Sequence, residues 1–256
     1  IYEDFVGREE IVVGEVRRFE RNGDMVIALP SPDQDTQVEA ILPRREQIPH
    51  ESYRLARSVK AVITSVTKEP SKENRGSGAQ ITLSQRHENF VKKLFEQQVP
   101  EIYHGIVEIR DVARIYGEAR GVKVSVYSKD PNVDPAGACI GEGGLRVKAV
   151  EEEIGGDKIE IVLYSSDAPI YVCNAIQPAE VSRLLIDHDE MKMDVIVPDE
   201  QLSKAIGRRG KNVRLASLLT GWSLDIYAES KMIERENRIK LMIEGQHGVN
   251  SEAFNK

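Results

Sequence analysis

The residues of this sequence best suited to bind a ligand are five cations between residues 201 and 224, a stretch that contains no Asp or Glu. They are Lys204, Arg208, Arg209, Lys211 and Arg214. Arginine and lysine bind phosphate oxygens, and arginine can do so through two parallel hydrogen bonds. A solvated helix face is the alternative explanation, but such a face ordinarily mixes both signs of charge. The stretch therefore predicts contact with a phosphate backbone, although the chain has a net charge of -7 and a pI of about 5.4.

Two of these arginines lie inside a Gly-x-x-Gly motif, residues 207–210, which follows a first copy at residues 141–144 by 66 residues. Each copy reads as a short helix ending in isoleucine, the motif, a longer helix, a glycine and a strand, preceded by two strand-like runs. The glycines permit positive φ and let another backbone approach, and the helix that follows points its free N–H groups at that backbone. A plain helix–helix turn explains one such motif equally well. Its repetition, with arginines in the second copy, favours KH domains, which clamp single-stranded RNA at this turn.

We expect each copy to contact RNA through the motif and its basic or apolar neighbours. For the second copy these residues are Gly207, Arg208, Arg209, Gly210, Lys211, Asn212, Arg214, Lys204 and Ile206. For the first copy they are Gly141, Gly143, Gly144, Arg146 and Lys148. Because Glu142 in the first motif opposes a phosphate, a KH fold kept there for architecture alone stays open as an alternative.

The segment before the repeat reads as a small β-barrel. Five short apolar or alternating runs, at residues 11–16, 25–29, 38–42, 59–66 and 80–83, are separated by turn-rich segments. Five strands with an insertion between the third and fourth match the plan of the OB barrel. Since RNA-binding barrels stack bases on aromatic rings, Phe19 with Arg17, Arg18 and Arg21 is the candidate contact. A barrel that acts as a spacer or contacts a protein is the alternative.

These patterns predict a multidomain α+β protein. Its parts are an OB-type barrel at 1–84, a linker helix and first KH domain at 85–166, a second KH domain at 167–230 and a helical or disordered tail at 231–256. Ser84 is the expected N-cap of the linker helix, which Pro100 ends. Only residues 164–169 separate the last strand of the first KH domain from the next helix, so we expect the two KH domains to pack as one body.

Other protein classes are disfavoured. No phosphate-binding loop, nucleophile elbow or zinc-ligand spacing occurs and the five histidines are scattered, so we expect no catalytic residue, no metal and no cofactor. No apolar run has the length of a membrane span. Two unpatterned cysteines, Cys139 and Cys173, fit a reducing cytoplasm, with a disulfide as the alternative. The acidic pI argues against a ribosomal component, although a ribosome-associated or scaffold RNA-binding protein remains the second hypothesis.

Several ordered segments resemble the NusA family of bacterial transcription termination and antitermination factors. They are residues 40–44 with 46–49, 90–95 with 99–103, 130–135 with 137–139, and 202–222. The resemblance implies an S1-type OB barrel and two KH domains of the bacterial (type II) topology that act as one RNA-binding unit. It also implies nascent single-stranded RNA and RNA polymerase as partners, with other antitermination factors beside them, in a cytoplasmic protein that we expect to be a monomer.

Three features depart from the family pattern, the first being that residues 230–256 match no segment of it. Family members carry an N-terminal polymerase-contacting domain that this sequence does not show, and the start at Ile1 suggests a fragment. The family also places a basic residue in the first motif, where Glu142 and Gly143 stand here.

Overall fold

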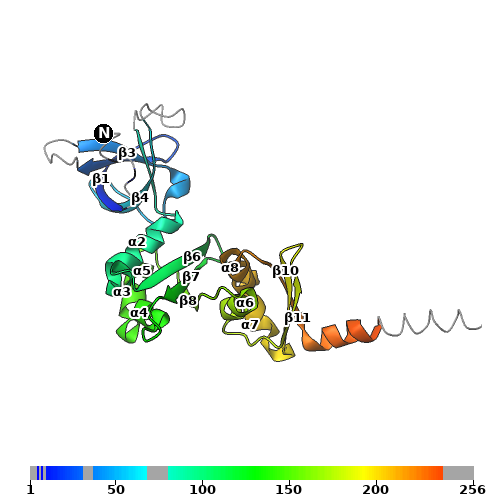
Figure 1. Cartoon of the computed structure of the whole chain (residues 1–256). Helices are drawn as coiled ribbons and strands as arrows, with labels where there is room; N and C mark the ends of the chain where they lie inside the picture. The colour runs from blue at the N-terminus through cyan, green and yellow to red at the C-terminus, as the bar shows by residue number, and fades with distance from the viewer. Residues whose placement is uncertain (1–4, 6, 8–9, 31–36, 68–79, 239–256) are drawn as a thin grey trace, which may run out of the picture.

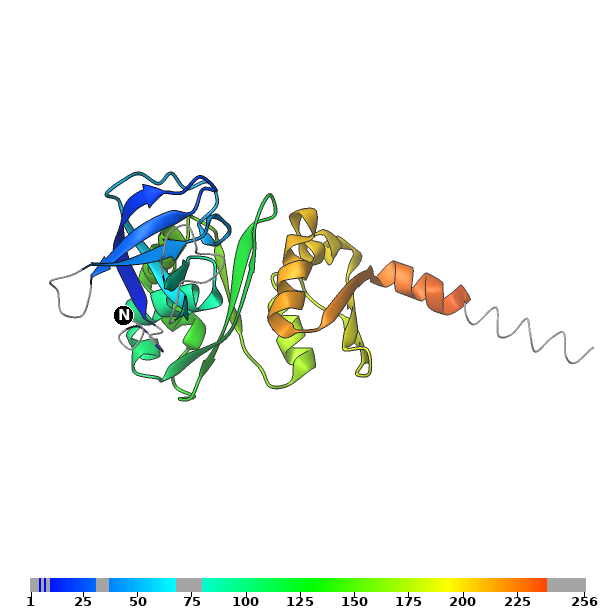
Figure 2. The ribbon, with the colours of Figure 1, turned by 90° about the horizontal axis from the view of Figure 1, so that it is seen from above.

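A computed structural model describes residues 5, 7, 10–30, 37–67 and 80–238 of the chain. Three domains follow one another along the molecule, with the barrel at one end and the sheet of the second KH domain at the other (Figures 1 and 2). The multidomain α+β architecture predicted from the sequence is confirmed. The described part of the predicted tail is a helix over residues 229–238, and the rest of the tail lies outside the described residues.

The first domain is a closed barrel of five strands in the order β1-β2-β3-β5-β4. The strands are β1 Ile11–Phe19, β2 Met25–Pro30, β3 Gln37–Leu42, β4 Ser58–Val66 and β5 Ile81–Ser84, with a short 3-10 helix, η1 Arg44–Glu46, in the insertion. Buried apolar side chains, among them Met25, Ile27 and Leu42, fill the barrel. A Cβ on Gly14 of β1 would lie 2.5 Å from Cγ2 of Ile27 on β2, so only glycine fits at this position.

The two KH domains have the same order of elements, which is a helical segment, two strands, two helices and a strand. The first contains α2 Glu88–Gln98, α3 Pro100–Tyr103, β6 Val107–Ile115, β7 Gly121–Ser128, α4 Pro135–Ile140, η2 Glu142–Gly144, α5 Leu145–Glu153 and β8 Ile159–Leu163. The second contains α6 Ala168–Ile176, β9 Arg183–Asp187, β10 Lys192–Val197, η3 Asp199–Gln201, α7 Leu202–Ile206, η4 Arg208–Gly210, α8 Lys211–Thr220 and β11 Ser223–Ala228. In each sheet the central strand, β7 or β10, pairs antiparallel with the strand before it and parallel with the last strand.

The linker helix α2 begins later than the sequence pattern predicts. Its N-cap is His87, whose Nδ1 accepts a hydrogen bond from the Asn89 N–H at 3.2 Å. Ser84 still belongs to strand β5, and its Oγ accepts from the N–H groups of Arg86 and His87 in the turn before the helix. The assignment of Ser84 as N-cap is therefore wrong, because its hydroxyl closes the strand–helix turn.

Side chains of the barrel and the first KH domain interlock. Val62 of the barrel joins the apolar core around α2, and Lys60 forms an ion pair with Glu153 of α5. Arg86 donates from Nη1 to the carbonyl oxygen of Arg45 in the barrel at 2.8 Å, and its guanidinium lies 3.6 Å from the centre of the Tyr116 ring at the tip of the β6–β7 hairpin. These contacts fix the barrel against α5 and the hairpin.

The two KH domains share one apolar core. Ala113 and Val162 of the first sheet belong to the same buried cluster as Tyr171 of α6 and Leu215 of α8. Lys123 on β7 is only 1% exposed, and its Nζ lies 2.7 Å from Oε2 of Glu160 and 3.3 Å from the carbonyl oxygen of Gln177. Burial lowers the pKa of Lys123, and the Glu160 carboxylate opposes that shift. The helices of the second domain thus cover the face of the first sheet that carries Ala113, Lys123 and Val162, which we call its outer face.

Candidate nucleic-acid interface

The two Gly-x-x-Gly turns have nearly the same backbone. Gly141 (φ 71°, ψ 173°) and Gly207 (φ 74°, ψ 165°) lie in a region that is essentially restricted to glycine. A Cβ on Gly207 would lie 2.7 Å from the backbone nitrogen of Asn212, so the first glycine also allows the turn to close onto the next helix. Gly144 and Gly210 are left-handed and are the N-caps of α5 and α8. The repeat read from the sequence is therefore a structural repeat.

The third position distinguishes the two turns. Gly143 (φ 59°, ψ 15°) and Arg209 (φ 55°, ψ 29°) have the same left-handed conformation, although one is glycine and the other is not. A side chain in this conformation costs roughly 1 kcal/mol. The second turn therefore keeps an arginine where glycine would be relaxed, and such strain is characteristic of functional sites.

The N-terminus of α8 is open to an anion. No side chain caps its first turn, so backbone N–H groups and the positive end of the helix dipole point out of the Gly-x-x-Gly turn. Lys204, Arg208 and Arg214 are exposed around this point, and none of them forms an ion pair with another described residue. The arrangement provides both backbone and side-chain donors for phosphate oxygens.

Carboxylates of the first KH domain hold the other two cations of the stretch. Arg209 forms an ion pair with Glu118 at the tip of the β6–β7 hairpin, and both side chains are largely exposed. Lys211 Nζ lies 3.6 Å from Oε1 of Glu160. The sequence could not reveal these partners, because they lie far from the motif along the chain.

Two further predicted residues of the second copy occupy different environments. Asn212 is buried, and its side-chain amide donates to the carbonyl oxygens of Ile176 (2.8 Å), Ala205 (3.2 Å) and Lys204 (3.3 Å). It thereby joins α6, α7 and α8, and its donors are already used within the protein. Ile206 at the end of α7 is 36% exposed and Ile140 at the end of α4 is 41% exposed, and both offer apolar surface beside the turn.

The first turn has few available cations. Arg146 Nη1 donates to Oε2 of Glu101 at 3.0 Å and to the carbonyl oxygen of Ala138 at 2.7 Å. Lys148 Nζ donates back to the carbonyl oxygen of Gly143 at 3.2 Å, while Glu142 is exposed in the turn. The first turn has the backbone of the second, but Arg146 is ion-paired and Lys148 donates to the turn itself.

The barrel residues predicted to contact RNA lie apart from both turns. Arg18 pairs with Glu20 and Glu39, and Arg17 hydrogen-bonds to Gln37. Phe19 is 45% exposed at the end of β1, with Arg21 exposed in the turn that follows. The other end of β1, at Ile11, packs against the first KH domain, so these four residues face away from it.

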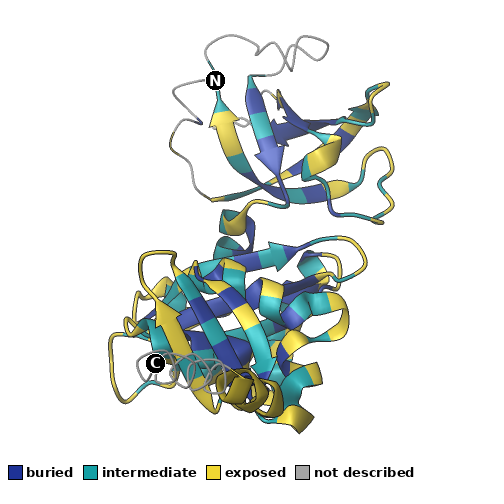
Figure 3. Cartoon of the chain, turned by 90° about the vertical axis from the view of Figure 1, so that its right-hand side faces the viewer, coloured by how far each residue is buried: buried dark blue, intermediate teal, exposed yellow. Residues whose placement is uncertain are grey.

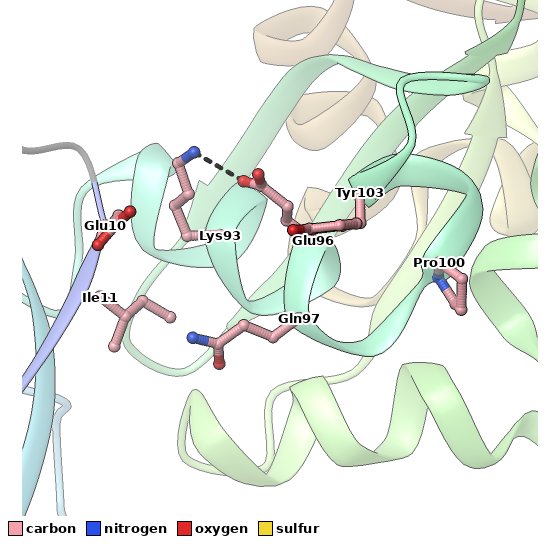
Figure 4. A pocket seen from close by; sticks show the side chains of 7 residues that line it. All are labelled: Glu10, Ile11, Lys93, Glu96, Gln97, Pro100 and Tyr103. Atoms are coloured by element: carbon pink, nitrogen blue, oxygen red, sulfur yellow. Dashed lines mark ion pairs between the residues drawn. The ribbon is translucent and has the colours of Figure 1, made fainter.

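The pocket between the barrel and α2 has the wrong charge for a phosphate. It has a volume of about 520 Å³ and is lined by Glu10, Ile11, Lys93, Glu96, Gln97, Pro100 and Tyr103 (Figure 4). Lys93 is already paired with Glu96 at 2.7 Å, which leaves the carboxylate of Glu10 beside a neutralised pair. We therefore do not assign this pocket to RNA.

The described residues contain no disulfide, no grouped metal ligands and no helix that could span a membrane. Both cysteines are free, which excludes the disulfide alternative, and burial raises the pKa of the Cys139 thiol to about 12. No three His, Cys, Asp or Glu side chains in the described ranges are grouped to hold a metal ion. Every helix in those ranges is too short or too polar to cross a bilayer.

Known proteins resemble nearly the whole chain. The family model of the NusA-like first KH domain matches residues 85–164 and that of the NusA-like second KH domain matches residues 168–234, together more than half of the chain. The transcription termination/antitermination protein NusA of Halalkalibacterium halodurans is 44% identical over 234 residues, which cover 91% of this chain and 58% of that protein. The proteins of the same name from Bacillus subtilis (44% identity, 90% of this chain, 58% of that protein) and Thermus thermophilus (40%, 91% and 56%) give similar matches. The chain thus spans little more than half the length of these relatives.

Proposed function

Because this chain belongs to the NusA family, we propose that it binds single-stranded nascent RNA and acts with RNA polymerase in transcription elongation, termination and antitermination. In this proposal the chain works in the cytoplasm as a monomer, by binding rather than by catalysis. The barrel (1–84), the first KH domain with its linker helix (85–166) and the second KH domain (167–230) act together as one RNA-binding unit.

One observation carries the RNA-binding part of the proposal. The second turn combines the uncapped N-terminus of α8 with the unpaired cations Lys204, Arg208 and Arg214 and with an arginine held in a strained conformation. A splayed single strand can present its phosphates to the turn, with its bases over the exposed side chain of Ile206. A duplex cannot make both contacts at once.

The test is a double charge reversal in the second turn. Replacing Arg208 and Arg209 by Asp should weaken binding of a labelled single-stranded RNA at least tenfold, since each lost phosphate contact removes a large electrostatic contribution. The thermal unfolding temperature should change little, because both side chains are exposed. Binding should weaken as salt is raised and should be poorer for a duplex of the same sequence.

The matched control is the double replacement Lys231→Asp and Arg235→Asp, which makes the same charge change on the exposed face of the helix at residues 229–238. If both double variants lose affinity equally, net charge rather than the turn determines binding. An unchanged affinity in the Arg208/Arg209 variant would exclude the second turn as the RNA site. Pull-down of RNA polymerase by the parent protein, with and without RNA, tests the polymerase part separately.

A further inference from the structure

The outer faces of the two KH sheets are equivalent in the repeat, yet among the described residues one row that is covered in the first sheet is open in the second. In the first domain, Ala113, Lys123 and Glu160 form a row across β6, β7 and β8. In the second domain the same row is Leu185, Asp194 and Asp225 across β9, β10 and β11. The first row lies under α6 and α8, whereas the second faces outward at the end of the molecule opposite the barrel.

The uncovered row is apolar at one end and acidic at the other. Ala113 is 3% exposed in the core shared by the KH domains, but Leu185, its equivalent, is 41% exposed. Met191, in the turn between β9 and β10, is 49% exposed. Figure 3 looks onto this end of the molecule, where strand β9 is exposed along most of its length. The helix at residues 229–238 flanks the sheet, with Glu236 paired to Arg183 at the start of β9.

The two rows differ in charge, and this difference indicates the sign of the charge that a partner would carry. Lys123 and Glu160 neutralise each other beneath the second KH domain. At the equivalent positions Asp194 and Asp225 are both acidic, and they share Lys192, whose Nζ lies 2.7 Å from Oδ2 of Asp225 and 3.8 Å from Oδ1 of Asp194. That oxygen of Asp194 is buried and has no hydrogen-bond partner among the described residues. The row therefore lacks one positive charge that a covering element would supply.

The covered row shows what kind of element fits. A Cβ on Gly121 would lie 3.1 Å from Cδ of Lys211 and 3.3 Å from Cδ1 of Leu215, so these two residues, one helical turn apart, face the first sheet. Lys211 also brings its ammonium group to Glu160. A helix with a cation and an apolar residue four positions apart thus covers the outer face of a KH sheet in this same protein.

We propose that the outer face of the β9-β10-β11 sheet is a docking surface for a basic amphipathic helix of a partner protein. A lysine or arginine of that helix binds Asp194 and Asp225, and an apolar side chain one turn away covers Leu185. The 200 Å³ hollow lined by Leu185, Ile186, Asp187, Lys192 and Asp194 receives the apolar side chain. The proposal does not depend on RNA binding, because the Gly-x-x-Gly turn lies on the helical side of the sheet.

The probe is a capped, alanine-based helical peptide with lysine and leucine four residues apart, titrated into the isotope-labelled chain and followed by NMR. We expect saturable shifts at Leu185, Met191, Asp194 and Asp225, and none with a peptide in which glutamate replaces the lysine. The double variant Asp194→Asn and Asp225→Asn should bind the peptide about fivefold more weakly, since the charge contacts of one half-buried and one exposed carboxylate are lost. Leu185→Ser should weaken it through the apolar contact.

Unchanged thermal unfolding and RNA affinity would show that the Asp194/Asp225 and Leu185 variants are folded. Glu118→Gln, on the first KH domain, is the control variant that should leave peptide binding intact. Absence of saturable binding, equal binding of the glutamate peptide, or full affinity in the double variant would overturn the proposal. Concentration-dependent shifts of the same residues without peptide would assign the face to a second copy of the chain instead. Loss of those shifts on removal of residues 239–256 would assign it to the chain's own C-terminal segment.

Discussion

At the scale of single residues, the second turn keeps a side chain in a conformation that glycine adopts without strain. Arg209 and Gly143 have the same backbone angles, so the first copy shows that the turn forms without an arginine. Arg208, its neighbour, has an ordinary negative φ. The two arginines therefore differ in what they cost the fold, although they contribute the same charge to the site.

This difference gives an opposed pair of predictions for stability. Arg209→Gly should leave the free energy of unfolding unchanged or raise it by up to about 1 kcal/mol, since it relieves left-handed strain and loses only an exposed ion pair. Arg208→Gly should lower it by roughly 0.5–1 kcal/mol, because glycine there only adds freedom to the unfolded chain. Both variants should bind single-stranded RNA more weakly. Urea unfolding and RNA titration check this, and stability changes of the same sign in both variants would contradict it.

The sequence predicted which cations surround the second turn, but not which of them form ion pairs. Residue type and spacing identified Arg209 and Lys211, since an acid-free basic stretch is visible along the chain. Their partners Glu118 and Glu160 come from the first KH domain, and only the packing of two domains brings them near. Asn212 was predicted to contact RNA, and its buried position was not foreseen, because a polar residue beside a basic turn looks exposed until its surrounding helices are placed.

At the scale of elements, Asn212 connects the helices that form the turn. Its amide bridges carbonyl groups at the C-terminal ends of α6 and α7, where helices leave acceptors without intrahelical partners. The position of α8 relative to the motif thus depends on one buried side chain. The five strands and the repeated helices were predictable because their apolar periodicity is local, whereas the start of α2 was not, because Ser84 and His87 compete for the same turn.

Removal of this side chain should affect folding first and binding second. Asn212→Ala should lower the free energy of unfolding by about 2–3 kcal/mol, since it leaves buried carbonyl groups without donors and creates a small cavity. Arg214→Ala, on the exposed side of the same helix, should change it by less than about 0.5 kcal/mol. Thermal or urea unfolding of the two variants compares them directly. An unchanged free energy of unfolding in Asn212→Ala would mean that α7 and α8 keep their arrangement without the amide.

At the scale of the whole molecule, the domains are joined by shared cores and buried charges. Lys123 lies beneath the second KH domain with Glu160 and the carbonyl oxygen of Gln177 as its partners. The short connection between the KH domains is compatible with this packing, but the sequence alone could not show that a lysine in the middle of an apolar strand would lie at their interface.

Replacing Lys123 and replacing Glu160 should change the free energy of unfolding by different amounts. Lys123→Met should change the free energy of unfolding by less than about 1 kcal/mol, because an apolar side chain of similar length replaces a buried charge. Glu160→Ala should cost about 2 kcal/mol, since it leaves the buried ammonium of Lys123 with a single carbonyl partner. Urea unfolding measures both, and NMR relaxation should show the two KH domains tumbling together in the parent and in Lys123→Met. Equal costs, or independent tumbling in the parent, would contradict a shared core.

In the ion pair between Glu118 and Arg209, a carboxylate of the first KH domain neutralises an arginine of the second. A phosphate that reaches Arg209 displaces a carboxylate that is already in place, while the RNA still releases the cation condensed on that phosphate. Arg209 therefore adds to the salt dependence of the complex as an unpaired cation would, but adds less to its affinity, because the ion pair with Glu118 has to break. The same exchange frees Glu118 at the tip of the β6–β7 hairpin, next to the Tyr116 ring that stacks on Arg86 at the barrel junction. A single carboxylate thus links the second turn to the hairpin whose Tyr116 ring contacts Arg86 at the barrel junction.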